Sequence, residues 1–143
     1  MAADAPAIRA MRDADTEAVI ALWKKAGVWR PWNDPLRDLA FARRGPHCTV
    51  LVAEIAGAIA ATAMLGEDGH RGWVHYVAAD PAQHRQGLGR AIMAAAEAWL
   101  AARGVWKVQL LVRGDNLAVQ DFYAKLGYRD TGAVCLQKII APG

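Results

Sequence analysis

Cysteine is scarce in this 143-residue sequence, which contains only Cys48 and Cys135. The two residues are far apart and form no CxxC pair, so we expect neither a disulfide framework nor thiol redox chemistry, and a reducing cytoplasm is the natural location. No apolar stretch of signal-peptide length opens the chain. The weakly charged stretch 49–66 carries only Glu54, but its β-branched residues and the break at Ala56-Gly57 favour two strands and a tight turn over a membrane-spanning helix.

Runs of basic residues are also missing, although the formal net charge is +3. Scattered lysines and arginines suit a small anion such as a nucleotide phosphate, and they make a nucleic-acid partner unexpected. Hydrophobic residues make up 55% of the chain, which is about the size of one ordinary domain. We therefore predict a single packed domain over residues 1–143.

The hydrophobic pattern alternates between strand and helix periods, with glycine and proline at the breaks. Strands are predicted at 8–11, 48–55, 58–65, 73–79 and 105–112, with one or two closing strands in 128–140. Helices are predicted from Asp13 or Asp15 to about Lys25, over 35–44 and 87–103, and from Asp115 or Asn116 to just before Gly127. This order predicts an α/β (α+β) architecture, a central mixed sheet with helices on both faces.

The segment from His84 to Arg90 lies between a strand that ends at Asp80-Pro81 and an amphipathic, alanine-rich helix. Such a bend directs free backbone N–H groups toward one point at the positive end of a helix, and its glycines let an anion approach closely. A dinucleotide fingerprint would need a third glycine where Ile92 stands, and a triphosphate P-loop would need Gly-Lys-Ser/Thr. The bend therefore predicts a diphosphate site, with a plain glycine turn as the alternative.

The Gly87-x-Gly89 bend resembles the coenzyme A motif of the GNAT superfamily of N-acetyltransferases. The likeness extends along most of the chain. It includes the hairpin from Val52-Ala53-Glu54 to Gly57, the stretch Val77-Ala78-Ala79-Asp80-Pro81, and the stretch from Asn116 through Phe122-Tyr123 to Leu126-Gly127-Tyr128. The loops 30–35 and 68–72 further resemble the small bacterial YpeA-like branch. One departure is His84, which stands where the family prefers Gln or Arg and so weakens a phosphate contact there.

The resemblance implies a mostly antiparallel sheet that splays between its fourth and fifth strands. It implies acetyl-coenzyme A (acetyl-CoA) as cosubstrate, no metal, and a pantetheine arm that pairs with the main chain of Val77 and Ala79. The implied cofactor-binding residues are Val77, Ala78, Ala79, Arg85, Gln86, Gly87, Leu88, Gly89, Arg90 and Asn116.

The resemblance also implies direct attack of a neutral amine on the thioester through a tetrahedral intermediate, with a backbone N–H near Ala79 as oxyanion donor. Tyr123 matches the family's proton donor to the leaving thiolate. Helical periodicity alone, however, would make Tyr123 a core residue beside Val119 and Leu126. The base is left open among the polar residues that could rim the acceptor cleft, each of which could also be a turn former, cap or solvated charge: Asp34, Glu67, Asp68, His70 and His75.

The tryptophan- and proline-rich loop is predicted to shape the acceptor pocket through Trp29, Arg30 and Trp32, although both tryptophans could instead seal an edge of the sheet. A protein N-terminus or a small-molecule amine fits a basic enzyme better than a polycation does. The alternative function is a CoA-binding regulatory module without catalysis. No membrane or nucleic-acid partner is expected, and the protein would be a monomer or homodimer.

Overall fold

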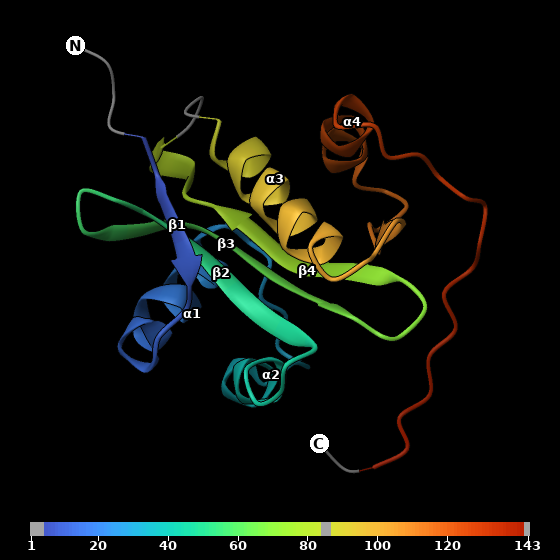
Figure 1. The fold of residues 1–143 in the computed structure, drawn as a ribbon, viewed down its shortest axis with the longest axis horizontal. Helices are drawn as coiled ribbons and strands as arrows, with labels where there is room; N and C mark the ends of the chain where they lie inside the picture. Colours follow the sequence, from blue (N-terminus) through green and yellow to red (C-terminus); the bar gives the residue numbers. More distant parts are fainter. Residues whose placement is uncertain (1–4, 84–86, 142–143) are drawn as a thin grey trace. The chain divides into compact units, whose positions relative to one another are not determined.

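The computed structural model describes residues 5–83 and 87–141, which fall into two compact units, Met1–Leu111 and Val112–Gly143 (Figure 1). The first unit contains a five-stranded sheet in the order β1-β2-β3-β4-β5. Its strands are β1 (Ala7–Ala10), β2 (Cys48–Ile55), β3 (Ala58–Glu67), β4 (Gly72–Ala79) and β5 (Val108–Leu110). All neighbours pair antiparallel except β4 and β5, which pair parallel. The predicted mixed, mostly antiparallel sheet is confirmed.

The helices begin and end close to the predicted positions. They are α1 (Thr16–Lys25), which follows the 3-10 turn Asp13–Asp15, α2 (Pro35–Ala42), α3 (Leu88–Ala101) and α4 (Leu117–Lys125), and a second 3-10 turn spans Pro81–Gln83. Within the described part of the chain, no helix is long and apolar enough to span a membrane.

The helices of the first unit cover both faces of the sheet. On one face, Val19, Leu22 and Trp23 of α1 pack in a cluster with alternate residues of β2, Val50 and Val52. This cluster also contains Leu39 and Ala42 of α2. The other alternate residues of β2, Leu51 and Ala53, face the opposite side of the sheet. There α3 packs against β2, β3 and β4 (Figure 1).

The second unit contains α4 followed by an extended chain. The predicted closing strands within 128–140 are wrong, because no strand follows β5 in the described residues. The apolar side chains of this segment are exposed, with fractions of 78–90% at Val134, Leu136, Ile139 and Ile140. Strand-like composition becomes a strand only where a partner supplies the ladder hydrogen bonds, and this segment pairs with no strand in the part of the chain that the structure describes.

Candidate functional site

A β-bulge interrupts β4 in the middle of the sheet. Thr62 of β3 stands opposite Ala78, and Met64 stands opposite His75, so both Tyr76 and Val77 face Ala63 alone. Tyr76 has a left-handed backbone, with φ at 49°. An L-residue in this region costs about 1–3 kcal/mol, and such strain collects at functional sites when the surroundings impose it.

Two consecutive hydrogen bonds, from α1 to β3 and from β3 to β4, hold the bulge in place. The indole Nε1 of Trp23 donates to Oγ1 of Thr62 over 3.0 Å, and the Thr62 hydroxyl donates to the backbone oxygen of Tyr76 over 3.1 Å. Trp23 and Thr62 are both fully buried. Water is therefore excluded from the bond between Trp23 and Thr62, and the two bonds fix the bulge to α1 and β3.

The Tyr76 side chain connects the bulge to α2 and to the loop before it. Its ring stacks on Trp23, with centroids 3.9 Å apart and planes 8° apart. Its hydroxyl donates to Oδ2 of Asp38 over 2.7 Å and also bonds the Asn33 side chain. Burial and the Asp38 carboxylate raise the pKa of Tyr76 above its usual range, so the phenol stays protonated.

After Val74, the parallel strands β4 and β5 separate. β5 pairs only with Gly72, Trp73 and Val74, so the rest of β4 has no described partner along this edge. The predicted cofactor residues Val77 and Ala79 are half-buried on this stretch, whereas Ala78 is buried at 3% exposure in the cluster below α1. The backbone of β4 here is available to pair with an extended ligand.

The N-terminus of α3 follows directly. Gly87 precedes the 14-residue helix with φ at 69°, and a Cβ added at Gly87 would meet no atom within 4 Å. Leu88 is buried in the core and Arg90 is exposed. The first amides of a helix have no intrahelical acceptor, so this open end can bind an anion. The other predicted phosphate ligands, Arg85 and Gln86, lie outside the described residues, as does His84.

The aromatic loop packs partly on the core. Trp29 packs beside the α1 cluster, and its buried Nε1 has no hydrogen-bond partner among the described residues. The guanidinium of Arg30 donates to the backbone oxygens of Gly27 and Trp29 over 2.6 and 3.0 Å, which holds the turn after α1. Trp32 is 68% exposed.

The predicted acceptor residues with acid or base groups fall in different environments. Asp34 caps α2 by accepting from the amides of Leu36 and Arg37. Glu67 pairs with His47, and His70 lies in an exposed turn. Asp34 and Glu67 therefore have local structural roles, and His70 is open to solvent.

His75 differs, because it immediately precedes the strained Tyr76. Its side chain is exposed at the surface and stacks beside Trp73, with ring centroids 6.3 Å apart. Crowding by surrounding protein atoms nevertheless lowers the pKa of His75, and the Asp38 carboxylate partly offsets this effect. His75 is therefore a neutral imidazole at pH 7 and can accept a proton.

The second unit carries the two remaining predicted residues. Oδ1 of Asn116 accepts from the amide of Val119 over 3.2 Å and caps α4. Tyr123 is buried within α4, and its ring makes edge contacts with Phe122 and Tyr128 at 5.0 and 5.7 Å. Burial raises the pKa of Tyr123 to about 12, so its hydroxyl is a donor at neutral pH.

Thr62, Tyr76 and Asp38 are not predicted from the sequence, because a bulge changes strand parity without leaving a glycine or proline signal. The one available hint was Thr62 itself, a hydroxyl in the strongly apolar stretch of β3, AIAATAML.

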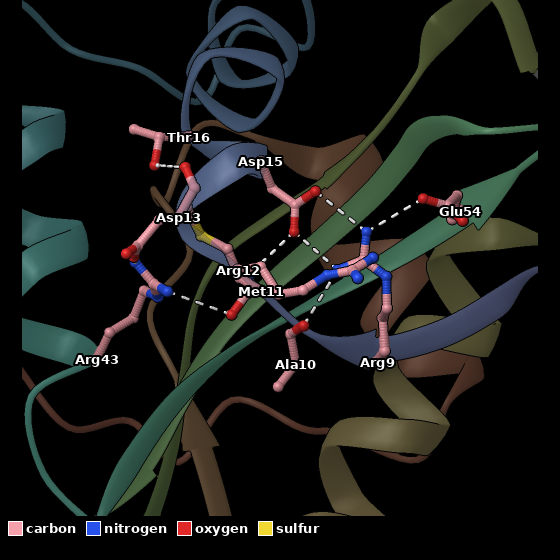
Figure 2. A network of polar contacts seen from close by, with 9 residues as sticks. All are labelled: Arg9, Ala10, Met11, Arg12, Asp13, Asp15, Thr16, Arg43 and Glu54. Atoms are coloured by element: carbon pink, nitrogen blue, oxygen red, sulfur yellow. Dashed lines mark hydrogen bonds and ion pairs between the residues drawn. The ribbon is translucent and has the colours of Figure 1, made fainter.

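A second polar network joins β1 to β2 and to the 3-10 turn before α1 (Figure 2). The Arg9 guanidinium donates to both carboxylate oxygens of Asp15 over 2.7 and 3.0 Å and to Glu54 over 3.1 Å. The bonds from Arg9, with a further bond from the Arg12 amide, lower the pKa of Asp15 to about 2. Asp15 and Glu54 also line a cavity of about 420 Å³, together with Lys25, which pairs with Asp80. No cluster of metal-ligating side chains occurs in residues 5–83 or 87–141.

An open strand edge that leads into the free amide end of a helix suggests a class of enzyme that binds a nucleotide-linked thioester, and comparisons with known proteins agree. The model of the acetyltransferase (GNAT) family matches residues 8–128. An acetyltransferase of Sodalis glossinidius is 41% identical over 90% of this chain and 91% of its own length. An acetyltransferase of Pectobacterium atrosepticum is 40% identical over 92% of this chain and 93% of its own length.

Solved structures show the same fold. The ribosomal-protein-S18-alanine N-acetyltransferase of Escherichia coli has a TM-score of 0.73 at 28% identity, covering 85% of this chain and 76% of that one. An aminoglycoside N-acetyltransferase in complex with CoA has a TM-score of 0.83 at 17% identity, covering 99% and 98%. The protein is thus an N-acetyltransferase by class, and the chain belongs to the acetyltransferase (GNAT) family.

Proposed function

We propose that this enzyme uses acetyl-CoA to acetylate a primary amine, either the N-terminus of a protein or a small molecule. The observation that carries the proposal is the unpaired edge of β4 after Val74, which leads into the left-handed Gly87 at the start of α3. An extended arm can pair along such an edge while a diphosphate lies against helix amides. One short segment of chain thus offers both halves of a CoA site.

The residues present fit the cosubstrate. Main-chain groups of Val77 and Ala79 would pair with the pantetheine arm, and Ala78 adds no bulk because its side chain is buried in the core. The amides of Leu88, Gly89 and Arg90 would bind the diphosphate, since the space in front of Gly87 is open. By resemblance, Arg85, Gln86 and Asn116 would contribute further contacts.

Acetyl-CoA supplies an activated acetyl group, and the amine attacks its carbonyl directly through a tetrahedral intermediate. A backbone N–H of β4, near Ala79, would stabilise the oxyanion. Tyr123 would return a proton to the departing sulfur. Its pKa, raised to about 12, keeps the hydroxyl protonated at neutral pH. The assignment of Tyr123 rests on its match to the family motif.

His75 is our candidate for the group that receives the amine proton. Its position beside the bulge and its lowered pKa support this role over Asp34, Glu67 and His70. We propose that those three residues, with Trp29, Arg30 and Trp32, form the outer acceptor surface. A lysine-like amine, with a pKa of about 10.4, depends more on a base than an α-amine near 8.

The Escherichia coli structural relative is named for acetylating an alanine of a ribosomal protein, and this favours testing α-amines first. We further propose that the chain is a single N-acetyltransferase domain, because the family match of residues 8–128 runs across both units. The YpeA-like branch is our proposed subfamily, on the resemblance of the loops 30–35 and 68–72. The two free cysteines suit a cytoplasmic enzyme. We also propose that the enzyme is a monomer or homodimer.

A thiol-release screen across amine classes tests the function, with the Tyr123→Phe variant run in parallel. We expect free thiol only when an accepted amine is present, and a rate lower by about 10²–10⁴ in the variant, as is typical for loss of a general acid. Binding of CoA without turnover of any amine would instead indicate a regulatory module. Unchanged turnover in Tyr123→Phe would remove the assignment of Tyr123 alone.

A further inference from the structure

The strained backbone of β4 is held in place by a side chain that is neither a proposed CoA-binding residue nor a proposed acceptor residue. Thr62 lies on β3, is fully buried, and bonds two partners at once, Trp23 and the Tyr76 carbonyl. A buried hydroxyl in an otherwise apolar stretch is costly unless its bonds are made.

The bonds define a single direction for the Thr62 proton. The indole nitrogen of Trp23 can only donate, so the Thr62 oxygen accepts from it, and the hydroxyl hydrogen is left for the Tyr76 carbonyl. That carbonyl is thereby directed toward β3. Its peptide bond to Val77 is trans, as are the other described bonds.

In a trans peptide unit, the N–H points opposite to the carbonyl. Because the Tyr76 oxygen points at Thr62, the N–H of Val77 points away from it, toward the edge of β4 that β5 leaves unpaired. We propose that Thr62 is a positioning residue: through the Tyr76 carbonyl it directs the Val77 amide at the reacting carbonyl of the acyl donor. The oxyanion donor of β4 would then be the N–H of Val77 and not that of Ala79, and the carbonyl of Val77 would remain for the pantetheine arm. This inference rests on the proposed function, because only that function puts an acyl group at this edge.

The proposal distinguishes two substitutions of the same residue. Thr62→Val has nearly the same shape but makes neither bond, whereas Thr62→Ser keeps the hydroxyl. We expect kcat to fall about tenfold or more in Thr62→Val, since a misdirected donor acts like a partly removed one. The affinity for CoA, which lacks the acetyl group, should remain within about threefold, and Thr62→Ser should stay within about threefold in both.

Assays must be run well below the unfolding temperature of each variant, so that lost stability does not lower the rate. If folded Thr62→Val keeps the wild-type kcat, the positioning role is wrong and Thr62 serves packing alone. If Thr62→Val does not fold, Trp23→Phe keeps an aromatic ring on Tyr76 but removes the N–H donor. It should lower kcat by about fivefold or more, and a kcat within about threefold of the wild type would overturn the proposal.

A second measurement does not depend on catalysis. Backbone NMR shifts of Tyr76 and Val77 in the ligand-free protein report the left-handed conformation. They should move in Thr62→Val and remain in Thr62→Ser, while the shifts of Ile92 and Leu100 in α3 stay unchanged. Unmoved shifts at residues 76 and 77 would overturn the proposal even if the wild type acetylates amines. Failure of the wild type to release thiol would instead count against the proposed function.

Discussion

The two faces of the sheet bury different kinds of side chain. Beneath α3, which packs on β3, the buried residues are apolar, and they include Ala61 and Ala63 of β3 and Ile92 and Leu100 of the helix. Beneath α1 and α2, the core contains hydrogen-bonded groups, with Thr62 between Trp23 and the β4 backbone. Packing volume alone can specify the first face. The second face also requires hydrogen bonds with defined directions. These bonds hold the strained backbone of β4.

The largest effect on stability is expected on the apolar face. Ile92 is fully buried in α3, and Ile92→Ala should lower the free energy of unfolding by about 2–5 kcal/mol through lost transfer energy and an unfilled cavity. The affinity of the folded protein for CoA should not change. Urea denaturation and calorimetry measure the two quantities. The control Ala98→Gln, at an exposed position of the same helix, should shift stability by less than about 0.5 kcal/mol. Weaker CoA binding in folded Ile92→Ala would mean that the faces are not separable.

The next largest effect concerns the polar network of Arg9, Asp15 and Glu54. The pKa of Asp15 is lowered from 3.8 to about 2 in the folded protein, so its carboxylate contributes about 2 kcal/mol above pH 5. This contribution disappears as the pH falls through 3.8 toward 2. Asp15→Asn should therefore lose about 2 kcal/mol at pH 7 and become less sensitive to acid. Denaturant titrations between pH 7 and 2 check this. An equally steep acid dependence in Asp15→Asn would contradict it.

A smaller effect is expected at Gly87, where the strand edge meets α3. Its φ of 69° suits glycine, so Gly87→Ala should cost about 1–2 kcal/mol of stability. The side chain also enters the proposed phosphate space, and CoA affinity should fall about tenfold. Gly57→Ala is a matched control, because Gly57 has φ of 81° and open surroundings but lies in the β2–β3 turn. Equal loss of CoA affinity in both variants would contradict a local role for Gly87.

The smallest effect is expected at the Tyr76 hydroxyl. Tyr76→Phe keeps the ring on Trp23 and removes the bond to Asp38, which should cost about 1 kcal/mol. The change should be visible as a small shift in the denaturation midpoint, with kcat within about threefold of the wild type. A loss of kcat as large as that of Thr62→Val would show that the ring's hydroxyl, and not the backbone carbonyl, controls the bulge.

Much of the fold followed from local signals. The apolar stripe of α3 and the Ala56-Gly57 turn, with φ of 52° and 81°, predicted their elements because each depends on residues close in sequence. The closing strands did not form, since pairing depends on a distant partner that composition does not specify. The bend at Gly87 was also visible.

The support of the bulge was not predictable from sequence. The chain from Trp23 through Thr62 to Tyr76 joins an α-helix and two strands, and only the folded register brings them together. The sequence predicts ligand-binding roles for Asp34 and Asn116, and in the structure each of these side chains also caps a helix. A polar residue before a helix has two plausible uses, and sequence cannot separate them.

The most direct test of the account is a calorimetric titration of the wild-type protein with CoA, followed by thiol release from acetyl-CoA across a panel of amines. We predict saturable binding that is weakened by Gly87→Ala but not by Gly57→Ala, together with thiol release that requires an amine. No measurable affinity for CoA and no thiol release with any amine class would contradict the account.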